Sequence, residues 1–138
     1  MRMDGKYLLD SNIIVALFNG DPTIEEQINN SGEVYLPVIA LGELYYGAYN
    51  STKKQTNLDR IDEFWTEIST LDCGEFTSKI YGQVKEKLKD NGTPIPENDI
   101  WIAELDLQYG LTLATRDGHF DYIEGLSLEK WWNKNHAA

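Results

Sequence analysis

Four acidic residues of this sequence lie within or beside apolar segments, where an unpaired charged side chain is unfavourable. Asp10 and Asp99 adjoin apolar runs, Glu43 lies within one, and Asp117 follows another. An unpaired charge is costly to bury among such neighbours. Carboxylates held close together repel and raise one another's pKa, and proteins tolerate them chiefly when a divalent cation neutralises them. These residues therefore predict a metal centre if the fold brings them together.

The donor chemistry of such a centre favours a hard cation. Oxygen ligands select Mg²⁺ or Mn²⁺, and the sequence has no cluster of Cys and His that would select zinc or copper. A Mg²⁺ held by a few carboxylates keeps several waters. It can activate one of them as a nucleophile and screen the charge of a phosphodiester.

Each carboxylate also has a simpler interpretation. Asp10 and Asp99 could be helix caps, Glu43 a helix residue that reaches solvent, and Asp117 a turn residue. These separate roles would all have to hold at positions that the topology directs to one place. The shared site is therefore favoured.

The elements that must position these residues alternate along the chain. A strand is predicted over Tyr7–Leu9, and Asp10-Ser11-Asn12 predicts the N-terminus of a helix that runs to Phe18. The spacing of apolar residues, with the Gly, Pro and Asn residues that interrupt it, predicts further helices over 23–29, 37–48, 53–69, 75–90 and 99–109, the last capped by Asn98. The same signals predict strands over 33–36, 71–73 and 111–114. A polar turn is predicted over 116–125.

This alternation favours an α/β fold, a parallel sheet with helices on both faces. Ligands of such sheets bind outside the carboxyl ends of the strands. Asp10, Thr115 and Asp117 are all expected at that edge.

Size and charge limit the function classes. The 138 residues suit one domain spanning 1–138. The net charge of −11 argues against gripping nucleic acid or an anionic membrane by bulk electrostatics. The single cysteine, Cys73, closes no intrachain disulfide, and no secretory signal or membrane span is found, so we expect a soluble cytoplasmic protein.

Four segments carry a resemblance to a known family. In chain order, the sequence resembles PIN-domain proteins of the VapC toxin type through Leu8-Leu9-Asp10-Ser11-Asn12, Ala40-Leu41-Gly42-Glu43-Leu44, Asn98-Asp99-Ile100-Trp101-Ile102-Ala103 and Leu113-Ala114-Thr115-Arg116-Asp117-Gly118-His119-Phe120. The likeness covers essentially the whole length. It implies a PIN-like three-layer fold, with a central mostly parallel sheet flanked by helices. It also implies a Mg²⁺- or Mn²⁺-dependent endoribonuclease, usually the toxin of a toxin–antitoxin pair and commonly a homodimer, with RNA as substrate and an antitoxin protein as partner.

The resemblance also implies roles for individual residues. Asp10 and Asp99 would hold the metal directly, Asp117 next, and Glu43 partly through water. Thr115 would help to orient a metal-bound water or a phosphate. In this interpretation, the bound cation inverts the sign of the charge where the phosphate sits, which reconciles an acidic protein with RNA.

Two other functions stay open from the sequence. A PIN-like scaffold without nuclease activity could act as a binding module. A phosphatase could form an aspartyl-phosphate on Asp10, but that chemistry usually places a second Asp two residues later, where Asn12 stands here.

Residues beside the motifs are assigned structural roles. Glu104 stands where the family often has a small residue, and we favour a solvated helix face for it over an extra carboxylate near the site. Asp121 is expected in a surface turn, His119 in the loop rather than as a base, and Arg116 in an exposed salt bridge. The aromatic set of Tyr45, Tyr46, Tyr49, Phe64 and Trp65 is assigned to core and interface rather than to base stacking, with a dimer or antitoxin surface favoured for part of it.

Overall fold

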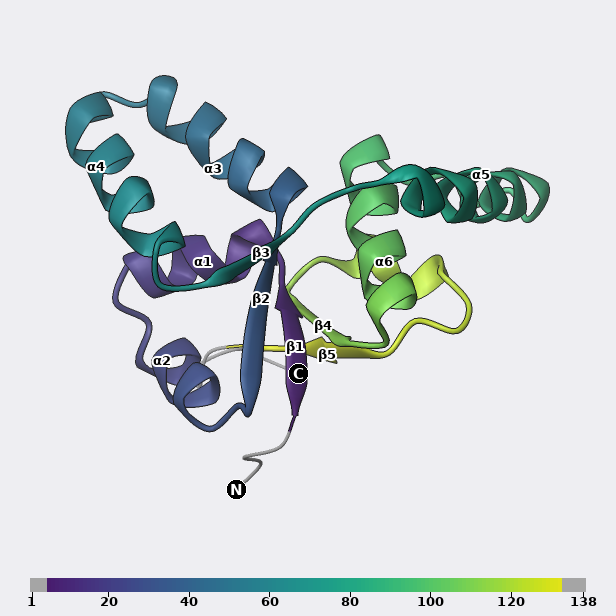
Figure 1. Ribbon diagram of the computed structural model, residues 1–138, viewed down its shortest axis with the longest axis horizontal. Helices are drawn as coiled ribbons and strands as arrows, with labels where there is room; N and C mark the ends of the chain where they lie inside the picture. The colour runs from purple at the N-terminus through teal and green to yellow at the C-terminus, as the bar shows by residue number, and fades with distance from the viewer. Residues whose placement is uncertain (1–4, 133–138) are drawn as a thin grey trace.

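A computed structural model describes residues 5–132 of the chain. In this range five parallel strands form one sheet in the order β3-β2-β1-β4-β5 (Figure 1). The strands are β1 (Lys6–Leu9), β2 (Glu33–Pro37), β3 (Ser69–Leu71), β4 (Thr112–Thr115) and β5 (Leu128–Lys130). The helices are α1 (Ser11–Phe18), α2 (Pro22–Asn29), α3 (Val38–Tyr49), α4 (Lys54–Trp65), α5 (Glu75–Asp90) and α6 (Glu97–Tyr109), with a short 3₁₀ helix, η1 (Gly118–Tyr122).

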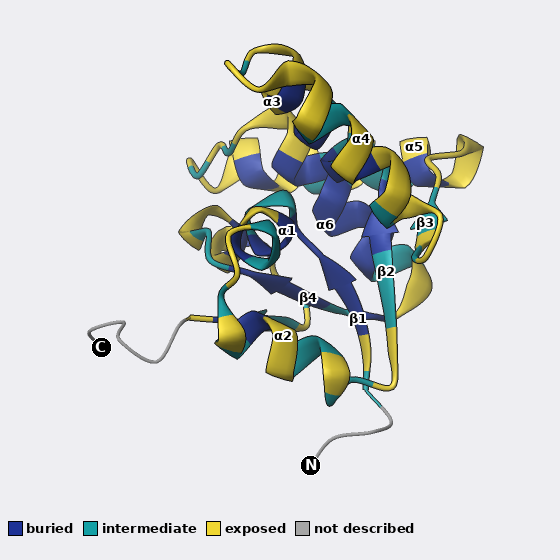
Figure 2. Cartoon of the chain, turned by 90° about the vertical axis from the view of Figure 1, so that its left-hand side faces the viewer, coloured by how far each residue is buried: buried dark blue, intermediate teal, exposed yellow. Residues whose placement is uncertain are grey.

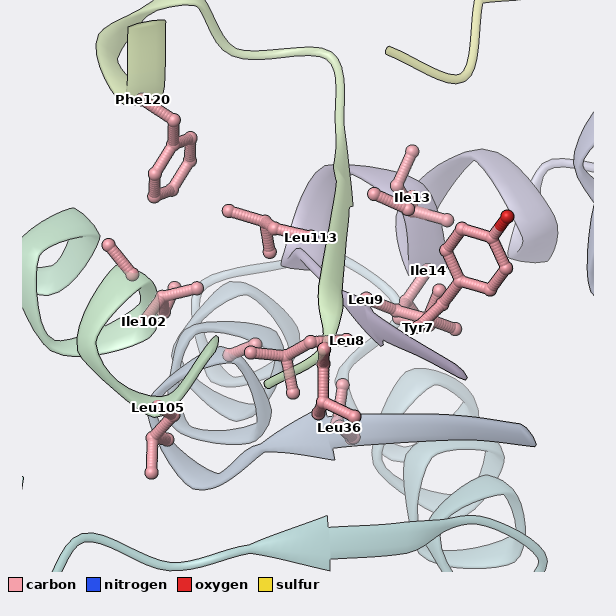
Figure 3. Packing of buried hydrophobic residues seen from close by; sticks show 14 of the residues in the cluster. Tyr7, Leu8, Leu9, Ile13, Ile14, Leu36, Ile102, Leu105, Leu113 and Phe120 are labelled. Carbon is pink, nitrogen blue, oxygen red and sulfur yellow. The ribbon is translucent and has the colours of Figure 1, made fainter. Parts of the chain in front are cut away.

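Helices cover both faces of the sheet because successive strand residues point to opposite sides. Tyr7 and Leu9 of β1 point toward Ile13 and Ile14 of α1 (Figure 3). On the other face, the side chains of Leu8 and Leu113 meet those of Ile102, Leu105 and Phe120. Figure 2 shows β1 and β4 buried between helices whose outer surfaces are exposed. The predicted α/β three-layer architecture is confirmed.

The strand order creates a switch point at the carboxyl end of the sheet. Strands β2 and β3 lie on one side of β1 in the sheet, and the later strands β4 and β5 lie on its other side. A crevice forms outside the carboxyl ends of strands where the order reverses in this way. Leu9 pairs with Ala114, so Asp10 and Thr115 lie side by side at this point.

Several element boundaries differ from the predicted ones. Strand β3 is Ser69–Leu71 rather than 71–73, because it pairs in register with β2, where Tyr35 lies opposite Ser69. Pro37 ends β2 and caps α3 instead of starting the helix. The cap of α6 is Pro96 rather than Asn98, since the extended Pro96 presents its carbonyl to the amide of Asp99 at 3.1 Å.

Within the polar turn predicted over 116–125, the chain forms the 3₁₀ helix η1. Asp117 caps it by accepting a hydrogen bond from the amide of His119 at 2.8 Å. None of the helices in residues 5–132 combines the length and apolarity that crossing a membrane requires.

Two carboxyl groups of α6 are buried away from the switch point. Glu104 and Asp106 are 0% and 1% exposed, and both carboxylate oxygens of Glu104 and Oδ1 of Asp106 lack hydrogen-bond partners. The solvated position expected for Glu104 is wrong. It lies on the side of α6 that α5 covers, where Thr77 donates a hydrogen bond to Gln108 at 2.7 Å. Burial raises the pKa of Glu104 to about 7 and that of Asp106 to about 8.

The raised pKa of Asp106 makes stability depend on pH. The folded protein keeps a proton on this group that the unfolded chain releases near pH 4, so stability falls as the pH rises toward 8. Between pH 5 and pH 8, we expect the wild-type free energy of unfolding to drop by about 3–4 kcal/mol more than that of Asp106→Asn. Urea denaturation at both pH values measures this difference.

The exposed Asp90→Asn variant is the matched control, because it makes the same side-chain replacement at a solvated position at the end of α5. It should follow the wild-type pH dependence. Parallel pH profiles for Asp106→Asn and the wild type would contradict the prediction.

Candidate metal centre

Asp10 lies between the end of β1 and the first turn of α1. It is the N-cap of α1, as predicted, and its side chain is only 4% exposed. Its Oδ1 accepts a hydrogen bond from the amide of Ser11 at 2.8 Å, and Oδ2 accepts one from the hydroxyl of Thr115 at 2.7 Å. The carboxylate is therefore fixed from both β1 and β4.

Asn12 joins the same two strand ends. Its Nδ2 lies 3.3 Å from Asp10 Oδ2 and 3.2 Å from Thr115 Oγ1, while its Oδ1 accepts from the amide of Arg116 at 3.2 Å. The Thr115 hydroxyl also accepts from the amide of Asp117 at 3.0 Å. Thr115 is fully buried, so its hydroxyl orients Asp10 and the turn to Asp117.

Asp99 and Asp117 approach from the other side of the switch point. Helix α6 precedes the parallel strand β4 and begins at the carboxyl edge, which places Asp99 of its first turn there. Asp99 is 8% exposed. His119 connects the two carboxylates: its Nδ1 lies 3.0 Å from Asp99 Oδ2 and 3.0 Å from Asp117 Oδ1.

Glu43 reaches the centre from α3. It is half-buried, and its Oε1 is buried without a hydrogen-bond partner. Its negative charge raises the pKa of both Asp10 and Asp99, so it lies close enough to interact with both carboxylates. All four acidic residues singled out in the sequence thus converge; we call them the carboxylate cluster (Asp10, Glu43, Asp99 and Asp117).

The electrostatics of the cluster favour a cation. Burial raises the pKa of Asp10 to about 6 against the opposing hydrogen bonds from Thr115 and Ser11, and the charges of Asp99 and Glu43 raise it further. Burial also raises the pKa of Asp99, with Asp117 adding to the effect. The hydrogen bond to Asp99 raises the pKa of His119.

These observations fit a divalent cation. The oxygens come from four separate segments, and one of them, Glu43 Oε1, is buried and unpartnered. Among the ion pairs within residues 5–132, those that reach the cluster come from His119, with no Lys or Arg among them. The cluster is therefore left for an external positive charge to neutralise.

Two neighbouring residues do not serve the cluster. The guanidinium of Arg116 binds Asp21 at 2.7 Å and the carbonyl of Trp131 at 2.7 Å. The side chains of Arg116 and Asp21 are 19% and 12% exposed, so the salt bridge that was expected to be exposed is partly buried. Asp121 is exposed and pairs with Lys130 at 2.9 Å, which agrees with the predicted surface turn.

The role of His119 was missed from the sequence. Its ring contacts Asp117 two residues away and Asp99 twenty residues away, in another element. The pair of Asp117 and His119 flanking Gly118 was the one local signal, and turn chemistry explained it equally well.

Two cavities adjoin Glu43. The first, of about 330 Å³, lies between α1, α3 and α4, and includes Val15, Leu44 and Arg60; we call it the α1–α4 groove. The second, of about 550 Å³, is lined by Ile39, Gly42, Glu43, Tyr46 and Asn98.

The predicted aromatic set divides into two groups. Tyr45 binds Asp62 and accepts a hydrogen bond from Trp65 Nε1 at 3.0 Å, which ties α3 to α4. Tyr46 and Tyr49 are exposed.

Known proteins resemble this chain over most of its length. Residues 7–126 match the PIN domain family. A ribonuclease VapC2 of Haemophilus influenzae is 33% identical over 129 residues, covering 91% of this chain and 98% of that protein. A tRNA(fMet)-specific endonuclease VapC of Shigella flexneri is 31% identical with the same coverage.

Solved structures of other proteins also resemble this chain. A chain of the DNA-bound VapBC from Salmonella typhimurium has a TM-score of 0.86 and 30% identity, covering 93% of this chain and 99% of that chain. A chain of VapBC2 from Rickettsia felis, bound to a promoter fragment, has a TM-score of 0.83 and 28% identity, covering 91% of this chain and 98% of that chain. This chain belongs to the PIN-domain family.

Proposed function

We propose that this protein is an endoribonuclease that hydrolyses RNA phosphodiester bonds with a divalent cation held by the carboxylate cluster. The observation that carries the proposal is the convergence of Asp10, Glu43, Asp99 and Asp117 at the switch point of a PIN fold. The names of the VapC relatives, ribonuclease and tRNA(fMet)-specific endonuclease, support RNA as the substrate class.

The chain's own residues hold and shape the centre. Asp10 and Asp99 are the most buried carboxylates of the cluster and would hold the cation directly, with Asp117 beside them and Glu43 partly through water. The oxygen donors favour Mg²⁺ or Mn²⁺. Such a cation supplies an activated water and stabilises charge on the phosphoryl oxygens.

Local structure argues against the aspartyl-phosphate alternative. That chemistry would use a second acid two residues after Asp10. Asn12 fills this position with its amide bound to Asp10, Thr115 and the backbone of Arg116. The Asn12 amide therefore holds the site in place and cannot act as a general acid that protonates a leaving group.

Removing one charge from the cluster tests the nuclease proposal. Asp10→Asn and Asp99→Asn should each lower Mn²⁺-dependent RNA cleavage about 100-fold or more, because the cation loses a direct ligand. Calorimetry should show weakened Mn²⁺ binding in the same variants. Circular dichroism should show that both remain folded.

Asp121→Asn is the matched control, since Asp121 is exposed and pairs with Lys130 outside the cluster. Its cleavage rate should equal that of the wild type. Full cleavage by either cluster variant would reject the site. Mn²⁺ binding without any RNA cleavage would support the binding-module alternative.

Thr115 is proposed as a positioning residue. Thr115→Val keeps the side-chain volume but removes the donor to Asp10 and the acceptor for Asp117. We expect the pKa of Asp10 to rise, because the hydrogen bond that lowers it is lost. Carboxyl ¹³C NMR without metal measures that shift. Cleavage should fall by about tenfold or more, and Thr115→Ser should restore both.

The control is Thr112→Val in the same strand, where the hydroxyl meets Ser127 at 2.9 Å on the surface. It should leave the Asp10 titration unchanged. An unchanged Asp10 pKa in Thr115→Val would contradict the proposed role.

We also propose that the protein is the toxin of a VapBC-type pair, acting in the cytoplasm and assembling as a homodimer. The VapBC complexes among its structural relatives support an antitoxin partner. The α1–α4 groove suits a segment of such a partner, since it is largely apolar and includes the acidic Glu43 in its lining. A basic antitoxin tail also complements the net charge of −11.

A charge in the groove tests this partner surface. Val15 lines the groove and is 48% exposed. Val15→Asp should weaken binding of the antitoxin encoded beside this gene by about tenfold or more, because a carboxylate would be buried on an apolar face. RNA cleavage should stay at the wild-type rate. Tyr109→Asp, also 48% exposed but at the far end of α6, is the control, and equal antitoxin affinity for both variants would contradict the assignment.

A further inference from the structure

His119 places a ring nitrogen against two members of the carboxylate cluster. Its Nδ1 lies 3.0 Å from Asp99 Oδ2, 3.0 Å from Asp117 Oδ1 and 3.2 Å from Asp117 Oδ2. One ligand atom from each of the three residues can be chosen so that all lie within 4.8 Å of one another. A nitrogen and two carboxylates thus form a compact group of possible metal ligands.

The spacing suits a shared cation as well as hydrogen bonds. Neighbouring ligands of an octahedral ion at about 2.1 Å from its centre are about 3.0 Å apart, and opposite ligands about 4.2 Å. The two contacts of 3.0 Å from Nδ1 equal the spacing of neighbouring ligands. The imidazole therefore needs no large movement to exchange its carboxylate contacts for a metal contact.

The 3₁₀ helix η1 holds the ring in this position. Asp117 caps η1 by accepting from the backbone amide of His119 at 2.8 Å, so the same turn directs both side chains toward Asp99. The next residue, Phe120, is completely buried in the core beside α6 (Figure 3). The backbone of His119 is consequently held on both sides of the residue, and the two carboxylate contacts of Nδ1 orient its ring, although the side chain is 49% exposed.

We propose that His119 Nδ1 is a direct ligand of the cation in the carboxylate cluster, which makes the centre a mixed nitrogen and oxygen site. The inference rests on the proposed metal dependence. It narrows the choice of metal, because an imidazole suits transition ions while Mg²⁺ is bound through carboxylates and water. The centre therefore prefers Mn²⁺ over Mg²⁺, and His119 is a source of that preference.

Pulsed electron paramagnetic resonance of bound Mn²⁺ tests the ligand directly. With untagged protein and one equivalent of Mn²⁺, the wild type should show the ¹⁴N coupling of a ligated imidazole. Labelling histidine with ¹⁵N should change that signal, and His119→Gln should abolish it. The chain's other histidine, His136, provides the matched control: His136→Gln should keep the coupling.

Calorimetry gives the second measurement. His119→Gln should bind Mn²⁺ about tenfold more weakly or worse, while its Mg²⁺ affinity should change less than threefold. A wild-type Mn²⁺ complex without ¹⁴N coupling, or equal losses for both ions, overturns the inference. If the inference about His119 fails but Asp99→Asn still abolishes Mn²⁺ binding, the proposed function stands. A wild type that binds no Mn²⁺ overturns both.

Discussion

Burial of mutually repelling carboxylates at the carboxyl edge of the sheet is the constraint on which the rest of this structure depends. Asp10 is 4% exposed, and this burial is the main reason that its pKa rises to about 6, while the charges of Asp99 and Glu43 raise it further. Donors from Ser11 and Thr115 oppose this effect on one side, and His119 bridges the carboxylates on the other. These contacts hold the cluster together but do not cancel its charge. A divalent cation would cancel it, which is the physical basis of the proposed metal centre.

The geometry of the cluster is set by core packing. Leu8 pairs with Leu113, and both point into the layer beneath α6. That packing fixes the register of β1 against β4, so Asp10 comes to lie opposite Thr115. A slip of one residue would turn the Thr115 hydroxyl to the other face of the sheet. Apolar residues one or two positions before the site therefore determine whether its polar atoms can meet.

The features predicted correctly from the sequence are those that depend on neighbouring residues or on the fold class. Asp10 as a helix cap and the convergence of strand ends at one edge followed from spacing and alternation. Features decided by distant partners could not be predicted in this way. His119 meets Asp99 across twenty residues, β3 takes its register from β2, and Glu104 is buried because α5 covers that side of α6. In each case a neighbour remote in the chain overrides the local pattern.

The net charge of −11 takes on a different meaning once the cluster is placed. The long stretches without Lys or Arg, residues 7–52 and 91–115, contain Asp10, Glu43 and Asp99. Arg116, the cation nearest in sequence, is held by Asp21 and the carbonyl of Trp131. Within residues 5–132, no Lys or Arg forms an ion pair with the cluster, so the position proposed for the metal is left to the ion. In the proposed function, attraction for a phosphodiester would arise when the metal binds, so affinity for RNA would be coupled to the presence of the ion.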